Sequence, residues 1–249
     1  MIIRAIKTHI FQEGDGLFAF LVKYFKKLSE KSVVVITSKI VALAEKRTAV
    51  IKNAQTKEKL IIRESEFAMP TKYVWLTVKN GVVMASAGID ESNSNGKLIL
   101  LPNDSFKTAH ILRKKLQKKY SVKNLGVLIT DSHTMPFRAG TIGIAIGYAG
   151  FSGIKDYRGT PDIFGRKFGF SRMDVADSLA TAAVSVMGEG NEQQPLAIIE
   201  KAPIKFCDKI NRNELYIDIQ EDMYRPLFLK LSKYKKKPVR RPAKKKKFR

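Results

Sequence analysis

The sequence predicts a protein of the α+β class, with an irregular mixed α/β architecture rather than a doubly wound sheet. Short apolar runs typical of strands recur along the 249 residues, and amphipathic helix patterns lie between them. The strands and helices do not alternate in a regular βαβ order, which argues against a doubly wound sheet. A chain of this length can bury a sizeable core in one large domain or in two small ones.

Five apolar runs of four to six residues are predicted to form strands. They cover residues 33–37, 75–78, 82–87, 125–130 and 196–199. The sequence Lys79-Asn80-Gly81 separates the second run from the third and is typical of a tight hairpin turn. We therefore expect the second and third strands to pair as a hairpin.

The first predicted helix runs from residue 105 to about residue 120. Asp104 precedes it as a candidate N-cap. One face of this helix is rich in lysine, and we expect that face to be solvated. Its apolar face is formed by Ala109, Leu112, Leu116 and Tyr120.

The second predicted helix lies in DVADSLATAAVSVMGEG. Asp174 is its candidate N-cap, and Gly188 is placed to end it, so that Glu189 projects from the loop just beyond the helix. Small residues dominate the pattern, so a neighbouring element can approach closely. Its predicted apolar stripe is formed by Val175, Leu179, Ala182 and Val186.

The net charge of +23 is concentrated at the C-terminal end. Residues 230–249 contain twelve Lys or Arg and no acidic residue, so the rest of the chain carries 23 − 12 = +11. Because this segment has two prolines and few apolar residues, it cannot bury enough surface to fold. We expect a folded domain over residues 1–228 and a disordered Lys/Arg-rich tail over residues 229–249. The tail either binds nucleic acid through phosphate contacts or is solvated without a partner.

Cysteine content and hydropathy predict a cytoplasmic protein. Cys207 is the single cysteine, which excludes an internal disulfide framework and fits a reducing compartment. We interpret it as a partly buried small apolar residue. The N-terminal apolar stretch is too short for a signal peptide, and the weakly polar segment 140–154 is too short for a membrane span.

Three acidic residues share one sequence context, the end of a predicted element. Asp90 and Asp131 each follow a predicted strand, and Glu189 follows the second helix. Mg²⁺ and Mn²⁺ prefer oxygen ligands and are commonly held by a few carboxylates together with substrate phosphates. The pattern therefore suggests a metal site, and the alternative assigns Asp90 and Asp131 to turn or capping roles.

Two common nucleotide-binding fingerprints are absent from the sequence. Gly96-Lys97-Leu98 lacks the spacing and the hydroxyl residue of a P-loop, and the glycines of 140–153 do not form GxGxxG after a strand. Basic residues in a glycine-rich segment provide an alternative way to bind phosphate or carboxylate. These are Arg138, Lys155, Arg158 and Arg166, with Asp156 and Asp162 available to bind them in structural ion pairs instead.

Five separate segments resemble the GTP-dependent gamma-glutamyl ligases. They are TSKIVALAEKR (37–47), SAGIDESN (86–93), LITDSHTMPFRAG (128–140), KDYRGTPDIFGR (155–166) and DVADSLATAAVSVMGEG (174–190). The founding members add L-glutamate to a deazaflavin coenzyme called factor 420. TDSHTMPFRAG, GYAGF and EDMYRPLF look closer to a bacterial branch named for folate metabolism. The resemblance runs in order from about residue 5 to residue 200.

The resemblance implies a carbon–nitrogen ligase with two-lobed subunits that form a homodimer. GTP would phosphorylate a carboxylate of a folate-like or deazaflavin-like acceptor, and the amine of L-glutamate would then displace the phosphate. Such chemistry requires positioning and charge neutralisation more than covalent catalysis. Two divalent cations, Mg²⁺ or Mn²⁺, are implied as cofactors, and K⁺ is a further candidate.

The resemblance also assigns residues. Asp90 and Asp131 would bind one cation, and Ser132 and Glu189 the second, which makes Asp90, Asp131 and Glu189 the catalytic residues. Nucleotide contacts are implied for Ser38, for Asn93 and for the stretch 187–194, which includes Met187, Gly188 and Gly190. The N-terminal nucleotide contacts of the family map more loosely to residues 8–11. We add Arg138 as a phosphate-binding candidate.

The sequence departs from the family pattern at two places. Leu43 stands where the founding members have a nucleotide-binding lysine, and His133-Thr134-Met135 replaces a Gly-Arg pair after Asp131. Both departures lie where nucleotide and acceptor would be held, so GTP versus ATP and the identity of the acceptor stay open. An alternative reading is a nucleic-acid-binding protein on a catalytically retired ligase scaffold, acting through residues 230–249.

Overall fold

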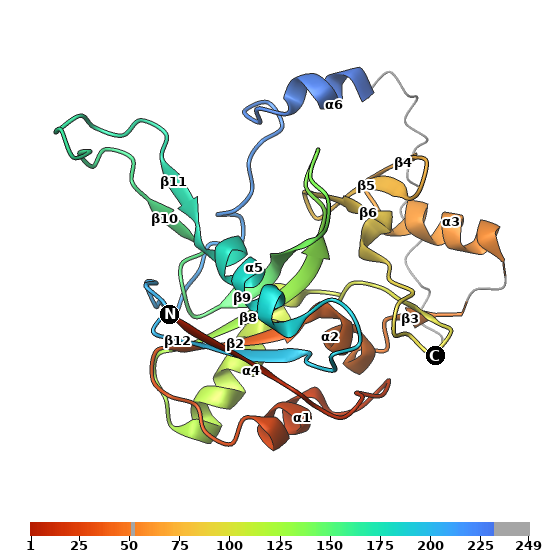
Figure 1. The fold of residues 1–249 in the computed structure, drawn as a ribbon, viewed down its shortest axis with the longest axis horizontal. Coiled ribbons are helices and arrows are strands. Elements are labelled where there is room, and N and C mark those ends of the chain that lie inside the picture. Colours follow the sequence, from red (N-terminus) through yellow and green to blue (C-terminus); the bar gives the residue numbers. More distant parts are fainter. Residues whose placement is uncertain (51–52, 232–249) are drawn as a thin grey trace, which may run out of the picture. The chain divides into compact units, whose positions relative to one another are not determined.

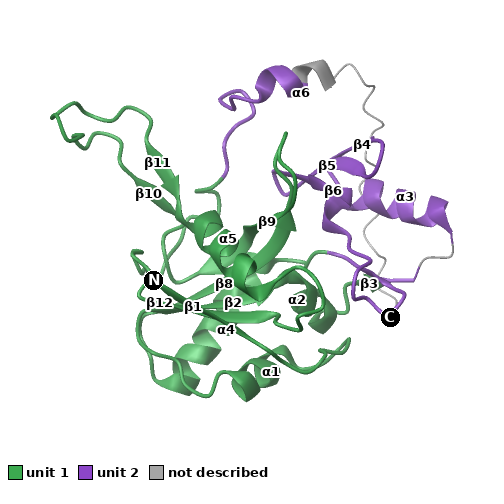
Figure 2. Ribbon diagram, in the orientation of Figure 1, with its two compact units in different colours: residues 1–48, 101–215 green, residues 49–100, 216–249 purple. Residues whose placement is uncertain are grey.

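The chain forms two compact units in a computed structural model that describes residues 1–50 and 53–231 (Figures 1 and 2). Unit 1 comprises Met1–Thr48 and Leu101–Leu215, and unit 2 comprises Ala49–Leu100 and the chain from Tyr216 onward. Both units combine helices and strands. The predicted mixed α/β class is therefore confirmed.

Unit 1 is built on a five-stranded mixed sheet. Only one neighbouring pair, β2 with β8, is parallel, and the other three pairs are antiparallel, so the sheet is not doubly wound. The strand order is β1 (Ile2–Ile6), β12 (Leu196–Glu200), β2 (Ser32–Thr37), β8 (Leu125–His133) and β9 (Ile142–Ala149).

Helices cover both faces of this sheet (Figure 1). Along β2, Val34 and Ile36 belong to one core cluster, and Val33 and Val35 belong to the other, because successive side chains point to opposite faces. Burial on both faces explains the continuous apolar run at residues 33–36. The four helices of unit 1 are α1 (Leu17–Tyr24), α2 (Ser38–Ala44), α4 (Ser105–Tyr120) and α5 (Val175–Met187).

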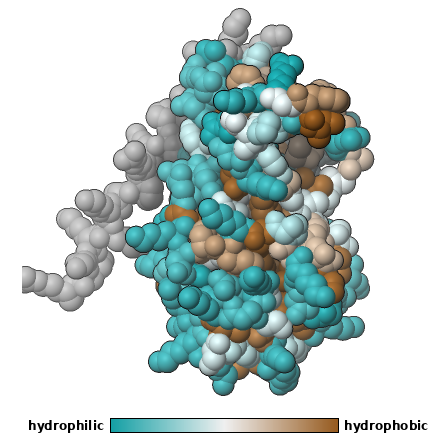
Figure 3. Space-filling model, turned by 90° about the vertical axis from the view of Figure 1, so that its left-hand side faces the viewer, coloured by the Kyte–Doolittle hydropathy of each residue, from teal (hydrophilic) through white to brown (hydrophobic). Residues whose placement is uncertain are grey.

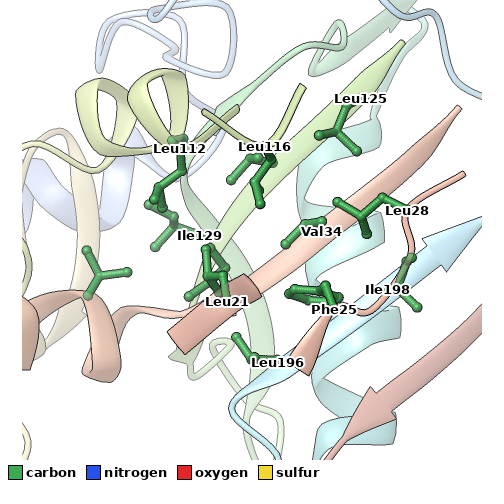
Figure 4. Close-up of a cluster of buried hydrophobic side chains, with 14 of the residues drawn as sticks. Leu21, Phe25, Leu28, Val34, Leu112, Leu116, Leu125, Ile129, Leu196 and Ile198 are labelled. Carbon is green, nitrogen blue, oxygen red and sulfur yellow. The ribbon is translucent and has the colours of Figure 1, made fainter. Parts of the chain in front are cut away.

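The first core cluster lies between the sheet and helices α1 and α4. Figure 4 shows Leu21 and Phe25 facing the sheet, with Leu112 and Leu116 from α4 packed over the same face. The predicted apolar face of α4 is thus confirmed, and its cap is too, since the Asp104 carboxylate accepts a hydrogen bond from the Lys107 N–H at 2.8 Å.

The second core cluster contains α5. The predicted cap and end are confirmed, because Asp174 accepts from the Asp177 N–H at 2.9 Å and the helix ends before Gly188. The predicted stripe was partly wrong. Ala182 is only partly buried and Val186 is 46% exposed, whereas the buried face uses Ala176, Ala180, Ala183, Val184 and Met187 together with Val175 and Leu179.

Strand β9 was not predicted, because its glycines obscure the strand pattern. A Cβ added to Gly143 would lie 2.5 Å from the Ala180 carbonyl oxygen of α5, and one added to Gly147 would lie 2.5 Å from Ser105 at the start of α4. Real Cβ atoms do not come so close to backbone, so both positions require glycine. The two glycines therefore let helices pack tightly against the strand on either side.

Strand β8 continues three residues beyond its predicted end, to His133. A bulge between Ile129 and Thr130 shifts its register with β9, and pairing then resumes. Asp131 consequently lies within β8 rather than after it, contrary to the prediction. The bulge re-aims the side chains that follow it.

A hairpin arm formed by β10 (Ile154–Asp156) and β11 (Arg172–Asp174) projects from unit 1 (Figure 1). The alternative that these charged residues form structural ion pairs is confirmed in part. Arg158 forms an ion pair with Asp156 at 2.6 Å, which lowers the pKa of the Asp156 carboxylate to about 2. Asp162 accepts hydrogen bonds from two backbone N–H groups in the tip loop.

Unit 2 contains a three-stranded antiparallel sheet and one long helix. Asn80 and Gly81 both have positive φ, 52° and 76°, so the predicted hairpin turn is confirmed. Strand β6 ends at Ala85, two residues short of the prediction, and a 3₁₀ turn, Ser86–Gly88, follows. The elements are α3 (Ala54–Glu64), β4 (Phe67–Pro70), β5 (Trp75–Lys79), β6 (Val82–Ala85), the short pair β3 (Thr48–Ala49) and β7 (Leu98–Ile99), and α6 (Arg225–Leu231).

Several expectations concern the chain as a whole. Helix α6 ends at Leu231, and the remainder of the predicted tail, residues 232–249, lies outside the described residues. Within the described part of the chain, no helix is long and apolar enough to cross a membrane. Hydrophilic side chains predominate on the face in Figure 3, where apolar ones gather in small patches. Cys207 is free and partly buried, as expected.

Candidate functional site

The parallel strands β2 and β8 position the first pair of candidate residues in unit 1. Thr37 is paired with Thr130 at the end of the parallel ladder, and the next residue of each strand is a site candidate. The Ser38 hydroxyl donates a hydrogen bond to Asp131 Oδ1 at 2.8 Å. In sheets with parallel strands, ligands commonly bind outside the carboxyl ends of those strands.

The second pair joins β8 to the end of α5. Ser132 follows Asp131, and its hydroxyl donates a hydrogen bond to Glu189 Oε2 at 2.7 Å. Gly188, with φ 84°, ends α5 and directs Glu189 away from the helix. Both hydroxyl groups donate to carboxylates, so each pair fixes the orientation of an anionic oxygen donor at the same end of β8.

The loop after α5 folds around a carboxylate that the sequence analysis did not single out. The Gly190 N–H donates to Glu192 Oε2 at 2.8 Å, and a Cβ on Gly188 would lie 2.4 Å from Glu192 Cδ. The positive φ of Gly188, 84°, is what favours glycine at this position, since the flexible Glu192 side chain can move away from an added Cβ. Met187 is 2% exposed and packs in the core, so its side chain is not available to a nucleotide.

Backbone hydrogen bonds bring two more candidate segments to this edge of the sheet. The Thr37 N–H donates to the Pro195 carbonyl at 3.0 Å, and the Thr8 N–H donates to the Gln193 carbonyl at 2.9 Å. The loop 188–195 therefore lies beside the ends of β1 and β2. Residues 8–11, Ser38, Asp131, Ser132 and 187–194 thus meet at one edge of unit 1.

Two buried polar atoms beside Asp131 and Ser132 have no hydrogen-bond partner among the residues that the structure describes. They are Thr130 Oγ1 and His133 Nδ1. Burial lowers the pKa of His133, and the charge of Asp177 opposes that shift. Sequence reasoning assigned no role to either residue, because neither has a motif spacing.

Arg138 is not joined to this edge by its described contacts. It lies in the exposed loop between β8 and β9, where its N–H closes a turn onto the Met135 carbonyl at 3.2 Å. Leu43, at the position of the family's lysine, packs against the first core cluster. Its apolar side chain therefore contributes to the core and cannot bind phosphate.

Asp90 and Asn93 belong to unit 2. Asp90 exchanges two backbone hydrogen bonds of 2.9 Å with Ile99, and its Oδ1 accepts from the Ser92 N–H at 2.6 Å. Asn93 is exposed with φ 51°. Asp90 follows the 3₁₀ turn rather than a strand, contrary to the prediction.

The donor set of unit 1 suits a hard cation. Asp131, Ser132 and Glu189 supply oxygen atoms only. Among the residues that the structure describes, no three His, Cys, Asp or Glu side chains are gathered into a metal-binding group. Substrate oxygens would therefore have to complete the coordination, as is usual for Mg²⁺.

Comparison with known proteins places the chain in a family. A family model described as F420-0:Gamma-glutamyl ligase matches residues 5–201. A protein named Coenzyme F420:L-glutamate ligase from Methanococcus maripaludis (strain DSM 14266) is 35% identical over 217 residues, which cover 80% of this chain and 86% of the relative. The protein of that name from Archaeoglobus fulgidus is 29% identical over 234 residues, 87% of this chain and 92% of the relative.

Another relative of the same name, from Methanococcus maripaludis (strain C7), is 40% identical over 153 residues. That match spans 61% of this chain and 61% of the relative, less than two thirds of its length. The comparisons give no support to a nucleic-acid-binding protein. Because the family model covers most of the chain, and one long match reaches 35% identity, the chain belongs to the F420-0:gamma-glutamyl ligase family, whose members form carbon–nitrogen bonds.

Proposed function

We propose that the protein is a GTP- and divalent-metal-dependent ligase that forms an amide between L-glutamate and a carboxylate of a second substrate. One observation carries the proposal: two hydroxyl–carboxylate pairs, Ser38–Asp131 and Ser132–Glu189, lie at the edge of the sheet where residues 8–11 and the loop 188–195 meet. The family match supports the reaction class.

The proposed roles follow from the chemistry of the side chains. Asp131 and Glu189, together with the hydroxyl of Ser132, would hold one or two Mg²⁺ or Mn²⁺ ions. The resemblance assigns a metal-binding role to Asp90 of unit 2 as well. When bound, such ions would neutralise phosphate charge. Ser38 is a positioning residue, because its hydroxyl fixes the Asp131 carboxylate at 2.8 Å. The backbone of residues 188–190, already folded around a carboxylate, and Asn93 would contact the nucleotide.

The proposed reaction has two steps. A carboxylate oxygen of the acceptor attacks the γ-phosphorus of GTP, and the bond to the β-phosphate oxygen breaks, which gives an acyl phosphate and GDP. The amine of L-glutamate then attacks the acyl carbon, loses a proton and expels inorganic phosphate, which leaves an amide. The protein positions the reactants and stabilises negative charge in both steps.

The acceptor is proposed as a deazaflavin-like or folate-like carboxylic acid. The relatives described above are named for coenzyme F420, which supports the deazaflavin-like class. GTP is preferred over ATP through the resemblance to GTP-dependent ligases. Because Leu43 stands where the family has a nucleotide-binding lysine, the preference for GTP over ATP is tested by competition between the two nucleotides.

A homodimer is proposed as the working assembly. The hairpin arm exposes three large apolar side chains, Ile163, Phe164 and Phe170, each at least 89% exposed. Such exposure is unusual for a monomer and is expected where a second copy covers the arm. Light scattering should give the mass of a dimer, and the double substitution of Phe164 and Phe170 by serine should shift it toward the monomer. An unchanged mass would contradict this role for the arm.

The ligase proposal is tested by incubating the protein with labelled L-glutamate, Mn²⁺, deazaflavin-type or folate-type acceptors, and either GTP or ATP. We expect glutamate incorporation and phosphate release in equal amounts, with GTP preferred. Asp131→Asn should abolish both. Nucleotide turnover that persists in Asp131→Asn would contradict the site, and efficient turnover with ATP but not GTP would contradict the nucleotide assignment.

A further inference from the structure

We infer that unit 1 contains a second ligand site, a cavity for a multiply charged anionic small molecule beside the first half of α4. The cavity has a volume of about 470 Å³ and is lined by the start of α4, the end of β9 and the segment 208–212. Pockets for small ligands typically have volumes of about 300–1,000 Å³. The cavity is therefore large enough for a phosphate ester or a polycarboxylate.

This cavity lies at the opposite end of the sheet from Asp131. Ala149, which lines the cavity, is paired with Val127 near the start of β8, whereas Asp131 is paired with Ile144. Four residues of β8 separate Val127 from Asp131, which corresponds to about 13 Å of strand at ~3.3 Å per residue. None of the proposed catalytic residues lines the cavity.

Basic side chains exceed acidic ones on the cavity wall. Lys107, Lys209 and Arg212 line it together with two carboxylates, Asp104 and Asp208. Both carboxylates already have partners. Asp104 caps α4 and forms an ion pair with Arg212, and Asp208 binds the Arg113 guanidinium at 2.8 Å. The two lysine ammonium groups consequently remain to attract an anion.

Arg113 adds a positive charge behind the wall. Its side chain is 2% exposed, its Nε donates to the Leu125 carbonyl at 2.7 Å, and its Nη1 is buried without a hydrogen-bond partner. The carboxylate of Asp208 is 76% exposed, so the negative partner of this buried cation faces solvent. Because Asp208 also lines the cavity, Arg113 offsets the negative charge that this carboxylate brings to the wall.

The apolar part of the wall is held firmly in place. The Phe106 ring packs against the Tyr148 ring at 5.1 Å between centroids, and the Arg212 guanidinium lies over the Phe106 ring at 5.1 Å. The Tyr148 hydroxyl donates to Glu214 at 2.7 Å. A wall fixed in this way needs little reordering on binding, and Arg212 and His110 add N–H donors beside the two lysines.

The site is tested with inorganic pyrophosphate and citrate as probes, with EDTA present so that no divalent metal assists binding elsewhere. Binding to the full chain is followed by calorimetry and by NMR signals of His110 and Phe106. We expect saturable binding with shifts at both residues. The double variant Lys107→Gln/Lys209→Gln should bind at least 10-fold more weakly.

The matched control is Lys118→Gln/Lys119→Gln, which removes two exposed lysines from the last turn of the same helix. It should bind as the wild type does. Absence of saturable binding by both probes, or equal weakening in the two double variants, would overturn the inference, because the second result indicates attraction to the general positive charge. Glutamate ligation by either variant is irrelevant to the outcome, so the test is independent of the proposed function.

Discussion

The candidate residues of the two units are held in different ways. In unit 1, hydrogen bonds join side chains that are 93 residues apart, Ser38 with Asp131, and 57 residues apart, Ser132 with Glu189. In unit 2, the Asp90 carboxylate accepts from a backbone N–H only two residues away. The candidate residues of unit 1 therefore depend on the whole fold of that unit, whereas the Asp90 carboxylate of unit 2 belongs to a turn.

This difference has a physical consequence. The two hydroxyl–carboxylate pairs of unit 1 form only if β2 and β8 keep their register and α5 keeps its position along β9. In return, the carboxylates are oriented before a ligand arrives, which lowers the cost of binding. A turn such as that of Asp90 is less demanding on the fold, and its geometry is expected to adjust more readily to a ligand.

The largest predicted effect is on catalysis, and it should be the same in both units. Asp131→Asn and Asp90→Asn should each lower the rate of glutamate incorporation by at least about 100-fold, because each removes a proposed ligand charge. The thermal midpoint should change by only a few degrees in either variant. Full activity in Asp90→Asn would show that the site is confined to unit 1.

The next effect tests whether the pairs of unit 1 depend on close packing. Gly143→Ala would place a methyl group 2.5 Å from the Ala180 carbonyl oxygen, so α5 must move away from β9. We expect a loss of about 1–3 kcal/mol in unfolding free energy, measured by urea denaturation, with weaker metal binding near Glu189.

The matched control for this prediction is Gly169→Ala on the hairpin arm. An added Cβ there meets nothing within 4 Å, and the backbone is outside the left-handed region. Its stability should match that of the wild type. Equal stability of Gly143→Ala and Gly169→Ala would contradict the packing account.

A smaller effect is expected from removing one hydroxyl partner. Ser38→Ala leaves Asp131 charged but removes one hydrogen bond that orients it, so Mn²⁺ affinity should fall by roughly 10-fold, as is typical for residues that orient metal ligands. Ser94→Ala in unit 2 is the control, because that hydroxyl donates only to the Glu91 carbonyl. Comparable losses in the two variants would indicate that hydroxyl removal acts through general destabilisation.

The smallest effect concerns stability and pH. Burial raises the pKa of Asp174 to about 7, and the hydrogen bond from the Asp177 backbone N–H opposes the rise. Because this value is above that of the unfolded chain, the folded state binds more protons between about pH 4 and about pH 7, and stability falls as the pH rises through this window.

Asp174→Asn removes this titration and keeps an N-cap residue. Thermal midpoints measured from pH 4 to pH 8 should fall with rising pH in the wild type by more than in the variant. The difference between the two proteins isolates Asp174 from His133, whose lowered pKa acts in the opposite direction. Parallel curves would contradict the assignment.

Much of the fold could be predicted where local signals were strong. The caps Asp104 and Asp174 and the Asn80-Gly81 turn were read correctly, because their chemistry is local. Strand β9 was missed, since its glycines are explained only by helices that pack on them. The stripe of α5 was assigned to the wrong side at Val186 for a related reason, because small residues carry little directional hydrophobic signal.

The candidate site could be predicted only in part. Sequence segments indicated which residues belong to it, but no spacing showed that Ser38 would bind Asp131 or that Ser132 would bind Glu189. Those contacts depend on strand register and on where α5 ends. Glu192 was not singled out, because no sequence pattern predicts that the Gly190 N–H donates to its carboxylate. Thr130 was not singled out, because the sequence does not show that its hydroxyl is buried.

The most direct test of the central claim is titration of Mn²⁺ in the presence of GDP, followed by electron paramagnetic resonance. The wild type should bind Mn²⁺ at least 10-fold more tightly than Asp131→Asn. Asp156→Asn, which removes an exposed carboxylate from the hairpin arm, should match the wild type. Equal affinity in the wild type and Asp131→Asn would contradict the claim that the end of β8 holds the metal.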